Sequence, residues 1–252
     1  MKKTLFFLCM LLSITAVVAQ TSTANLFEKA NKSYKDGKYN EAIKLYQEIE
    51  AKDSVSSTLY YNIANSYYKL NSVANTIYYY EKALKLDPLN TDASNNLEFA
   101  RRMTIDNIEE LPKTFLQRLE ANYIQKLSYN QWSSLAVFLS FLASILFLLF
   151  YVSSISNRKR IYFLTSILSF FLLAISVFIS YNQYQKAIKT KTAIIFSSKV
   201  SVNNAPTLNS NEVFVLHEGT KVNILDALDN WKKIKLADGK IGWISANALK
   251  EL

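Results

Sequence analysis

Few residues in this chain have side chains that can carry out chemistry. The 252 residues include one histidine, one cysteine and four glycines. A zinc site takes about four ligands and nucleophilic catalysis needs a nucleophile beside a base, so His217 and Cys9 are too small a set. The scattered glycines match neither spacing of a phosphate-binding loop. The sequence therefore predicts a non-enzymatic protein without catalytic, metal-binding or cofactor-binding residues, in which His217 is structural.

The distribution of charge argues against a nucleic-acid partner. The chain has 29 Lys and Arg residues and 20 Asp and Glu residues, which gives a net charge of +9. Residues 20–131 balance at 14 basic and 14 acidic side chains, whereas three basic residues stand together at 158–160. Nucleic-acid-binding proteins concentrate Lys and Arg on one folded surface. We interpret the basic residues as a membrane-topology signal.

The N-terminus has the pattern of a secretory signal peptide, predicted over residues 1–19. Two lysines precede an apolar run from Leu5 to Val18, and Ala19 is a small residue suited to cleavage. Cys9 falls inside the apolar run, so the exported chain is expected to have no thiol and no disulfide. The alternative is that this segment is not cleaved and anchors the chain in the membrane. The residues that follow it are then on the same side of the membrane as they would be after cleavage.

Two apolar segments, residues 132–152 and 161–181, are each long enough to cross a bilayer. At about 1.5 Å per residue, each helix spans roughly 30 Å. The connecting residues 153–160 contain the three adjacent basic residues, so this loop is predicted to be cytoplasmic. Neither segment contains Asp, Glu, Lys or Arg, which favours an anchor over a transporter. We therefore predict a two-pass membrane protein with both flanking regions on the side opposite the cytoplasm.

Residues 23–90 are self-similar at a period of 34. Ala30 recurs as Ala64 and Tyr46 recurs as Tyr80, and this period is typical of repeats that form two antiparallel helices. The alanine permits close contact between the helices, and the tyrosine fills that contact. The second unit resembles the tetratricopeptide repeat at Ala64, Tyr67, Tyr80, Ala83 and Pro88. We predict an all-α array over 23–106, consisting of units 23–56 and 57–90 and a capping helix at 91–103.

Stacked repeats of this kind line a concave groove with the first helix of each unit. Such a groove suits an extended peptide or a partner helix. Its predicted residues are aromatic, amide-bearing or basic: Asn31, Tyr34, Lys35, Tyr61, Asn62, Asn65, Tyr68, Lys69, Asn96, Phe99 and Arg102. A clamp for a chaperone's terminal carboxylate is not expected, because Phe27, Asp92 and Asn96 stand where that clamp has basic residues. The alternative is that these side chains only solvate a structural array.

A short amphipathic helix is predicted over residues 113–128, between the array and the first apolar segment. Phe115, Leu116, Leu119 and Tyr123 follow helical spacing, with basic side chains on the remaining surface. This pattern predicts a helix at the membrane interface. The alternative is a last helix that covers the end of the array.

The C-terminal residues 192–252 contain six short β-like runs, and Asp238-Gly239 is typical of a tight hairpin. The order of Val202–Pro206, Glu218–Thr220, Trp231 and Gly242–Ile244 resembles the bacterial SH3 family. This resemblance implies a small all-β barrel that binds cell-wall peptides or envelope proteins without catalysis. Asn203 and Trp231 are its expected ligand surface. Asn203 replaces an Arg that is frequent in the family, which puts any contact made by that Arg in doubt.

The fold class predicted for the chain is a multi-domain membrane protein with an all-α tetratricopeptide repeat array, a two-helix transmembrane hairpin and a small all-β SH3-like barrel. This order of parts resembles the BatE family of the Bacteroidetes aerotolerance operon. The resemblance implies membrane-anchored von Willebrand A-domain proteins and other envelope proteins as partners. We expect a non-catalytic scaffold without cofactors. The alternative is a sensor or anchor that binds peptidoglycan through the SH3 module.

Overall fold

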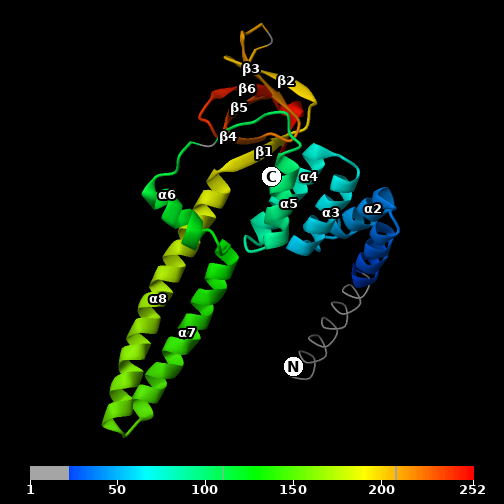
Figure 1. Ribbon diagram of the computed structural model, residues 1–252. Helices are drawn as coiled ribbons and strands as arrows, with labels where there is room; N and C mark the ends of the chain where they lie inside the picture. Colours follow the sequence, from blue (N-terminus) through cyan, green and yellow to red (C-terminus); the bar gives the residue numbers. More distant parts are fainter. Residues whose placement is uncertain (1–22, 110, 208) are drawn as a thin grey trace, which may run out of the picture.

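The computed structural model describes residues 23–109, 111–207 and 209–252, so the predicted signal peptide lies outside the described residues. Three parts follow one another along the chain: a helical array, a two-helix hairpin and an antiparallel sheet (Figure 1). The hairpin projects away from the other two parts, which lie against each other. The helical N-terminal region, the two apolar helices and the C-terminal sheet confirm the coarse architecture that the sequence predicts.

The array consists of consecutive helices arranged as antiparallel pairs. A helix over residues 23–35 precedes α2 (Tyr39–Glu50), α3 (Ser57–Lys69), α4 (Val73–Leu86) and α5 (Thr91–Arg101). The side chain of Ser56 accepts a hydrogen bond from the backbone N–H of Leu59, which caps the N-terminus of α3. Asn90 caps α5 in the same way, and Pro88 follows the end of α4, where the backbone becomes extended.

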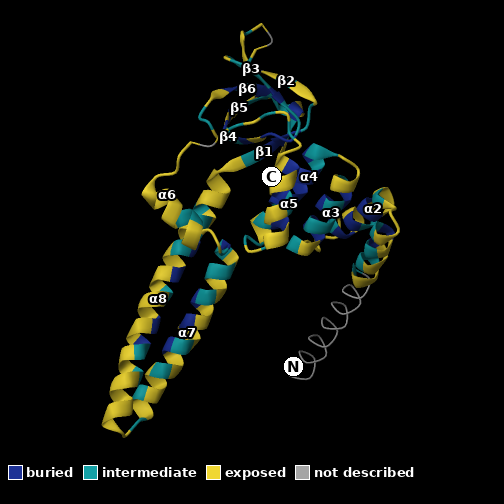
Figure 2. Cartoon of the chain, viewed as in Figure 1, coloured by how far each residue is buried: buried dark blue, intermediate teal, exposed yellow. Residues whose placement is uncertain are grey.

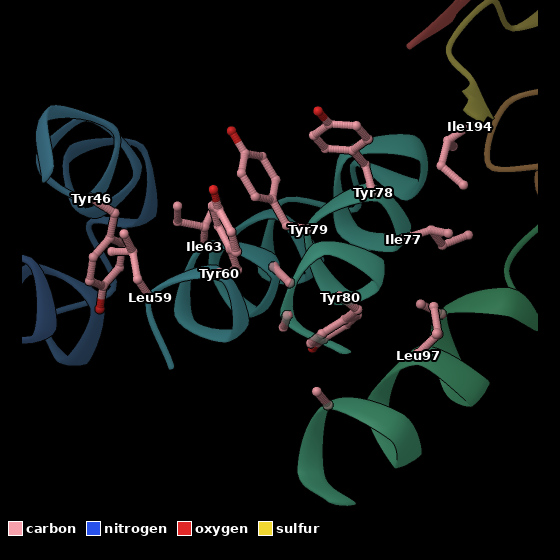
Figure 3. Packing of buried hydrophobic residues seen from close by; sticks show 14 of the residues in the cluster. Tyr46, Leu59, Tyr60, Ile63, Ile77, Tyr78, Tyr79, Tyr80, Leu97 and Ile194 are labelled. Atoms are coloured by element: carbon pink, nitrogen blue, oxygen red, sulfur yellow. The ribbon is translucent and has the colours of Figure 1, made fainter. Parts of the chain in front are cut away.

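Alanine and tyrosine side chains make the core of the array, as the 34-residue period predicts. Ala30 and Ala64 have no exposed surface, and Tyr46 and Tyr80 are each 1% exposed. Figure 3 shows these tyrosines packed among aliphatic residues of neighbouring helices. The small residues therefore lie where helices approach closely, and the rings fill the space beside them.

The segment between the array and the hairpin is shorter and less regular than the helix predicted over 113–128. Helix α6 (Phe115–Leu119) continues into a π-helical turn (Glu120–Ile124). The side chains of Thr114 and Gln117 form a reciprocal cap at the start of α6. Neither α6 nor the π-helical turn contains a buried residue, so this segment does not contribute to the core of the array.

The hairpin consists of α7 (Tyr129–Val152) and α8 (Ser156–Lys189), which contain 18-residue windows with mean hydropathies of 2.6 and 2.3, respectively. Both helices are long and apolar enough to cross a membrane. Figure 2 shows that most of their surface is exposed, in contrast to the array and the sheet. Helix α8 begins inside the segment predicted as a loop, so the basic residues 158–160 lie in its first turns. Arg and Lys are good helix formers, which explains this early start.

Small residues line the contact between α7 and α8. Ala136 and Ala143 of α7 are buried, as are Ser166 and Ser180 of α8. The Ser166 hydroxyl donates to the Ala143 carbonyl at 3.1 Å, and the Ser180 hydroxyl donates to the Tyr129 carbonyl at 2.9 Å. Short side chains allow the two backbones to approach closely enough for these bonds.

The sheet contains seven strands in the order β3-β2-β6-β5-β4-β1-β7, and its pairs are antiparallel. The strands are β1 (Lys191–Ile195), β2 (Lys199–Asn203), β3 (Glu212–His217), β4 (Lys221–Leu228), β5 (Trp231–Lys235), β6 (Ile241–Ser245) and β7 (Leu249–Glu251). The first six overlap the runs identified in the sequence. The sequence analysis missed β7, which is only three residues long and contains no β-branched residue to mark it.

Apolar side chains join the sheet to the array. Ile194 of β1 belongs to the same buried cluster as Ile77 of α4, and the rings of Tyr78 and Phe196 meet edge-on at 5.8 Å. Gly219, at the turn between β3 and β4, has φ +88°, and a Cβ there would lie 2.8 Å from Thr104 Cγ2. Glycine is therefore required at this turn both for its backbone conformation and for the close approach of the array.

Two carboxylates complete the contact. The Glu81 carboxylate of α4 accepts from Arg101 Nη2 of α5 at 2.8 Å and from Lys221 Nζ of β4 at 2.6 Å. The Asp106 carboxylate accepts from the Thr220 hydroxyl at 2.6 Å and from the His217 backbone N–H at 2.7 Å. The His217 ring Nδ1 lies 2.8 Å from the same carboxylate, consistent with a structural role.

These contacts determine the charge state of both carboxyl groups. Burial opposes the charge on Glu81, but Lys221 and Arg101 outweigh this effect and lower the pKa of the carboxyl. Burial also opposes the charge on Asp106, and the hydrogen bonds from Thr220 and His217 lower its pKa. Both groups therefore remain ionised at neutral pH and hold the array and the sheet together.

The first prediction concerns the packing of Ala64. Because this side chain has no exposed surface, Ala64→Trp should overpack the helix contact and cost about 1–3 kcal/mol of unfolding free energy. The measurement is denaturant unfolding of the detergent-solubilised chain. Ser94→Trp, at an exposed position of α5, is the matched control and should stay within about 0.5 kcal/mol of wild type. Equal stability of the two variants would contradict the packing described above.

The second prediction concerns Glu81. Removing its charge in Glu81→Gln should cost about 2 kcal/mol at pH 7, because Arg101 and Lys221 lose their shared partner. A lowered folded-state pKa gives stability that is present above the unfolded pKa and is lost as pH falls through the lowered value. Wild-type stability should therefore decrease below about pH 4.5, and the difference between wild type and the variant should shrink there.

The measurement is the thermal midpoint of the full chain between pH 3 and pH 7. Glu98→Gln is the control, because Glu98 forms an exposed pair with Arg102 within the same helix. Such pairs contribute about 0–1 kcal/mol. A Glu81→Gln variant that matches Glu98→Gln at every pH would show that the buried carboxylate does not stabilise the contact.

Candidate protein-binding groove

Asparagine side chains on the first helix of each repeat unit form hydrogen bonds with one another and with tyrosine side chains. Asn31 Oδ1 accepts from Tyr46 Oη at 2.6 Å and from Asn62 Nδ2 at 3.1 Å. Tyr46 belongs to the second helix of the same unit, whereas Asn62 belongs to the first helix of the next unit. One amide oxygen therefore joins three helices.

The same arrangement recurs 34 residues later. Asn65 Oδ1 accepts from the Tyr80 hydroxyl and from Asn96 Nδ2, the latter at 3.2 Å. Asn96 Nδ2 also lies 3.3 Å from the Tyr61 hydroxyl. We call the set Asn31, Tyr46, Asn62, Asn65, Tyr80 and Asn96 the amide ladder. Its repetition shows that the two predicted units are related by the 34-residue period in structure as well as in sequence.

The tyrosines of the amide ladder act as hydrogen-bond donors. Burial raises the pKa of Tyr46 to about 12 and raises the pKa of Tyr80 further. Both hydroxyls therefore keep their protons at neutral pH and donate to the asparagine oxygens. The ladder has a single donor–acceptor pattern over the physiological range.

A pocket of about 260 Å³ opens on the concave side of the array, beside Asn65, Tyr80 and Asn96 of the amide ladder. Tyr68 and Phe99 on its walls are 38% and 54% exposed, so both rings offer apolar surface to a ligand. The pocket is lined by Tyr34, Tyr61, Asn65, Tyr68, Lys69, Tyr80, Asn96 and Phe99. All of these except Tyr80 belong to the groove predicted from the sequence, so the structure brings those residues together.

The other predicted groove residues have different surroundings. Asn31 and Asn62 form a hydrogen bond with each other in the amide ladder. Lys35 is exposed near the end of the first helix. Arg102 pairs with Glu98 at 2.7 Å, and its guanidinium lies 5.3 Å from the centre of the Phe99 ring. The charge of Arg102 is therefore partly neutralised on its own helix.

The pocket presents both apolar and polar groups to a ligand. Asn65 uses its oxygen in the ladder, while its Nδ2 group donates no hydrogen bond to another described residue. Two N–H donors thus remain beside exposed aromatic rings, and Lys69 adds one positive charge. Backbone carbonyls of an extended peptide are suitable acceptors, and its apolar side chains suit the rings.

A second candidate surface lies on the sheet. The register pairs Asn203 with Trp243, Trp243 with Lys233, and Trp231 with Ser245. Paired residues and residues two apart share a face, so Asn203 and Trp231 lie on the same side of the sheet. The alternate residues, which include Ile234 and Ile244, form the core on the other side. All five residues of this surface are half-buried.

Comparison with known families finds a match in the repeat array and another in the sheet. Residues 57–90 match the tetratricopeptide repeat, and residues 198–250 match the bacterial SH3 domain. No curated protein matches the sequence at a significant level. The fold and these matches define a chain that combines two kinds of interaction domain with two apolar helices. Neither family is typically catalytic.

The groove residues predicted from the sequence did not include Tyr80, which lines the pocket. The contact between Asp106 and His217, which are 111 residues apart, had no signal in the sequence. The period of 34 that relates Asn31 to Asn65 and Asn62 to Asn96 was a usable signal for the ladder. Among the described residues, no group of three or more His, Cys, Asp and Glu could hold a metal ion.

The third prediction separates the structural role of Asn65 from a binding role. Asn65→Ala removes the acceptor of Tyr80 and Asn96, so unfolding free energy should fall by about 1–3 kcal/mol. The control is Asn95→Ala, because Asn95 is exposed and lies next to Asn96 in α5. This variant should change stability by less than about 0.5 kcal/mol. Denaturant unfolding of the purified chain measures both. Wild-type stability of Asn65→Ala would contradict a structural ladder.

Proposed function

We propose that this chain is a non-catalytic scaffold of the bacterial inner membrane that binds an extended segment of a partner protein in the groove of its repeat array. The observation that carries the proposal is the pocket, in which exposed aromatic rings surround an asparagine with free N–H donors. The amide ladder holds the Asn65 side chain in place before a partner binds, which lowers the conformational entropy lost on binding. The match to the tetratricopeptide repeat supports a protein ligand.

The proposed topology places the array and the sheet in the periplasm and α7 and α8 in the membrane. The length and hydropathy of both helices support this arrangement. Basic side chains at 158–160 lie at the far end of the hairpin, where the positive-inside rule favours the cytoplasm. The predicted signal peptide favours export of the array independently.

The partners that we propose are membrane-anchored von Willebrand A-domain proteins and other envelope proteins of an aerotolerance-type complex. This part of the proposal rests on the resemblance of the whole chain to the BatE family. A partner anchored in the same membrane would present its segment at a limited distance from the bilayer. Only Thr190 separates α8 from β1, and the sheet packs against the array, so in this topology the groove is also held at a limited distance from the membrane.

A second candidate function is binding of peptidoglycan through the SH3 module. The favouring observation is the outer surface of the sheet, where Trp231 and Trp243 lie with Asn203 and Lys233. Aromatic rings and amides are suitable for stacking on sugars and for bonding to peptide stems. The match of residues 198–250 to the bacterial SH3 domain supports this alternative.

The fourth prediction tests the groove. Tyr68→Ala should weaken capture of the partner from detergent extracts by about fivefold or more, equivalent to roughly 1 kcal/mol or more, because an exposed aromatic anchor is lost. Capture by wild type should persist as salt rises, since the contacts are mostly uncharged. Leu86→Ala is the matched control, because Leu86 is 41% exposed and lies outside the pocket.

The SH3 alternative is tested in the same preparation with Trp231→Ala and purified cell-wall sacculi. Deletion of the sheet is unsuitable, because Ile194 is part of the buried core of the array. If Trp231→Ala abolishes binding to partner or sacculi while Tyr68→Ala changes neither, the SH3 module is the binding element. The array is then a spacer.

A further inference from the structure

The segment of α6 and the π-helical turn has an apolar face that no other described part of the chain covers. Phe115, Leu116 and Tyr123 are 72%, 75% and 71% exposed, and Leu119 is 39% exposed. Clustered apolar side chains with this exposure indicate a surface that contacts something else. The question is what covers it.

Three contacts hold this segment against the end of the hairpin. The Ile124 carbonyl accepts from Trp132 Nε1 of α7 at 3.0 Å and from Gln183 Nε2 of α8 at 2.7 Å. Glu120 pairs with Lys186 one turn further along α8. The segment is therefore fixed to both helices by two hydrogen bonds and an ion pair.

The position of these contacts corresponds to the surface of a bilayer. Gln183 lies four residues beyond Ile179, where the continuous apolar run of α8 ends, which is about 6 Å along the helix. The headgroup layer on each side of the hydrocarbon core is roughly 5–7 Å thick. The segment is thus attached at the depth of the headgroups.

The chemistry around the segment is also that of a membrane interface. The rings of Tyr129 and Tyr184 meet edge-on at 5.7 Å at the same end of the hairpin, and Trp132 lies beside them. Tyrosine and tryptophan concentrate at this depth in membrane proteins. Exposed Arg118 lies two residues from Leu116, which at 3.6 residues per turn places it on the opposite side of the helix.

We infer that α6 and the π-helical turn lie in the headgroup layer of the membrane, with Phe115, Leu116, Leu119 and Tyr123 against the acyl chains. The occupant of the apolar face is the lipid bilayer, because hydrogen bonds fix this segment to the end of two helices whose own apolar side chains are exposed. The inference rests on the proposed membrane hairpin. It adds a third point of attachment, which holds the array at a fixed height and rotation above the bilayer.

The test is spin-label accessibility in the full chain, reconstituted into vesicles of phosphatidylethanolamine and phosphatidylglycerol. Cys9→Ser removes the single native cysteine. Single labels are then placed by Leu116→Cys, Tyr123→Cys, Arg118→Cys and, on the exposed surface of α7, Phe138→Cys. Collisions with lipid-soluble oxygen are compared with collisions with a water-soluble nickel complex. The ratio of oxygen to nickel collisions should be several-fold higher at positions 116 and 123 than at position 118.

The label at position 138 distinguishes the possible failures. If the label at position 138 is lipid-exposed while labels at positions 116 and 123 collide mainly with nickel, the inferred position of the segment in the headgroup layer is wrong. The membrane hairpin is then still supported. If position 138 collides mainly with nickel, the membrane hairpin itself is wrong, and the inference falls with it. Labels at 116 and 123 that are shielded from both reagents would show a protein on this face, such as a second copy of the chain, and would also overturn the inference.

Discussion

The buried carboxylate of Glu81, together with that of Asp106, bonds the array to the sheet. Glu81 is 9% exposed and bonds to Arg101 in the array and to Lys221 in the sheet. Separation of the sheet would remove Lys221 and leave Arg101 as the remaining partner, so this pairing favours the docked arrangement. Ile194 and Gly219 add apolar contact and close fit on the same side. The two interaction domains therefore form one unit, and both ends of the hairpin attach to it.

The amide ladder gives the groove residues two roles at once. The oxygen of Asn65 joins α3 to α4 and α5, and the same residue lines the pocket. Hydrogen bonds between helices stiffen a structure. The Asn65 side chain is consequently held in place by the repeat core beneath it. Tyr68 is different, because it lies on the wall and takes no part in the ladder.

Much of the fold follows from periodicity in the sequence. The period of 34 located Ala30, Ala64, Tyr46 and Tyr80 in the core, and alternation located the first six strands. The groove residues followed from that register. The contact between array and sheet did not, because Asp106 and His217 are 111 residues apart and neither belongs to a repeating pattern. The start of α8 also differed from the predicted boundary, since the Arg and Lys residues at 158–160 extend a helix as readily as they form a loop.

Helix α8 passes into β1 with only Thr190 between them, so the sheet is built on the end of the helix without a flexible joint. A helix of 34 residues is about 51 Å long and acts as a stiff rod. Tilting this rod by ten degrees moves its far end by about 9 Å. In the proposed topology, a change in bilayer thickness alters the tilt of α8 and so moves the array and the sheet sideways together, along with any partner bound in the groove.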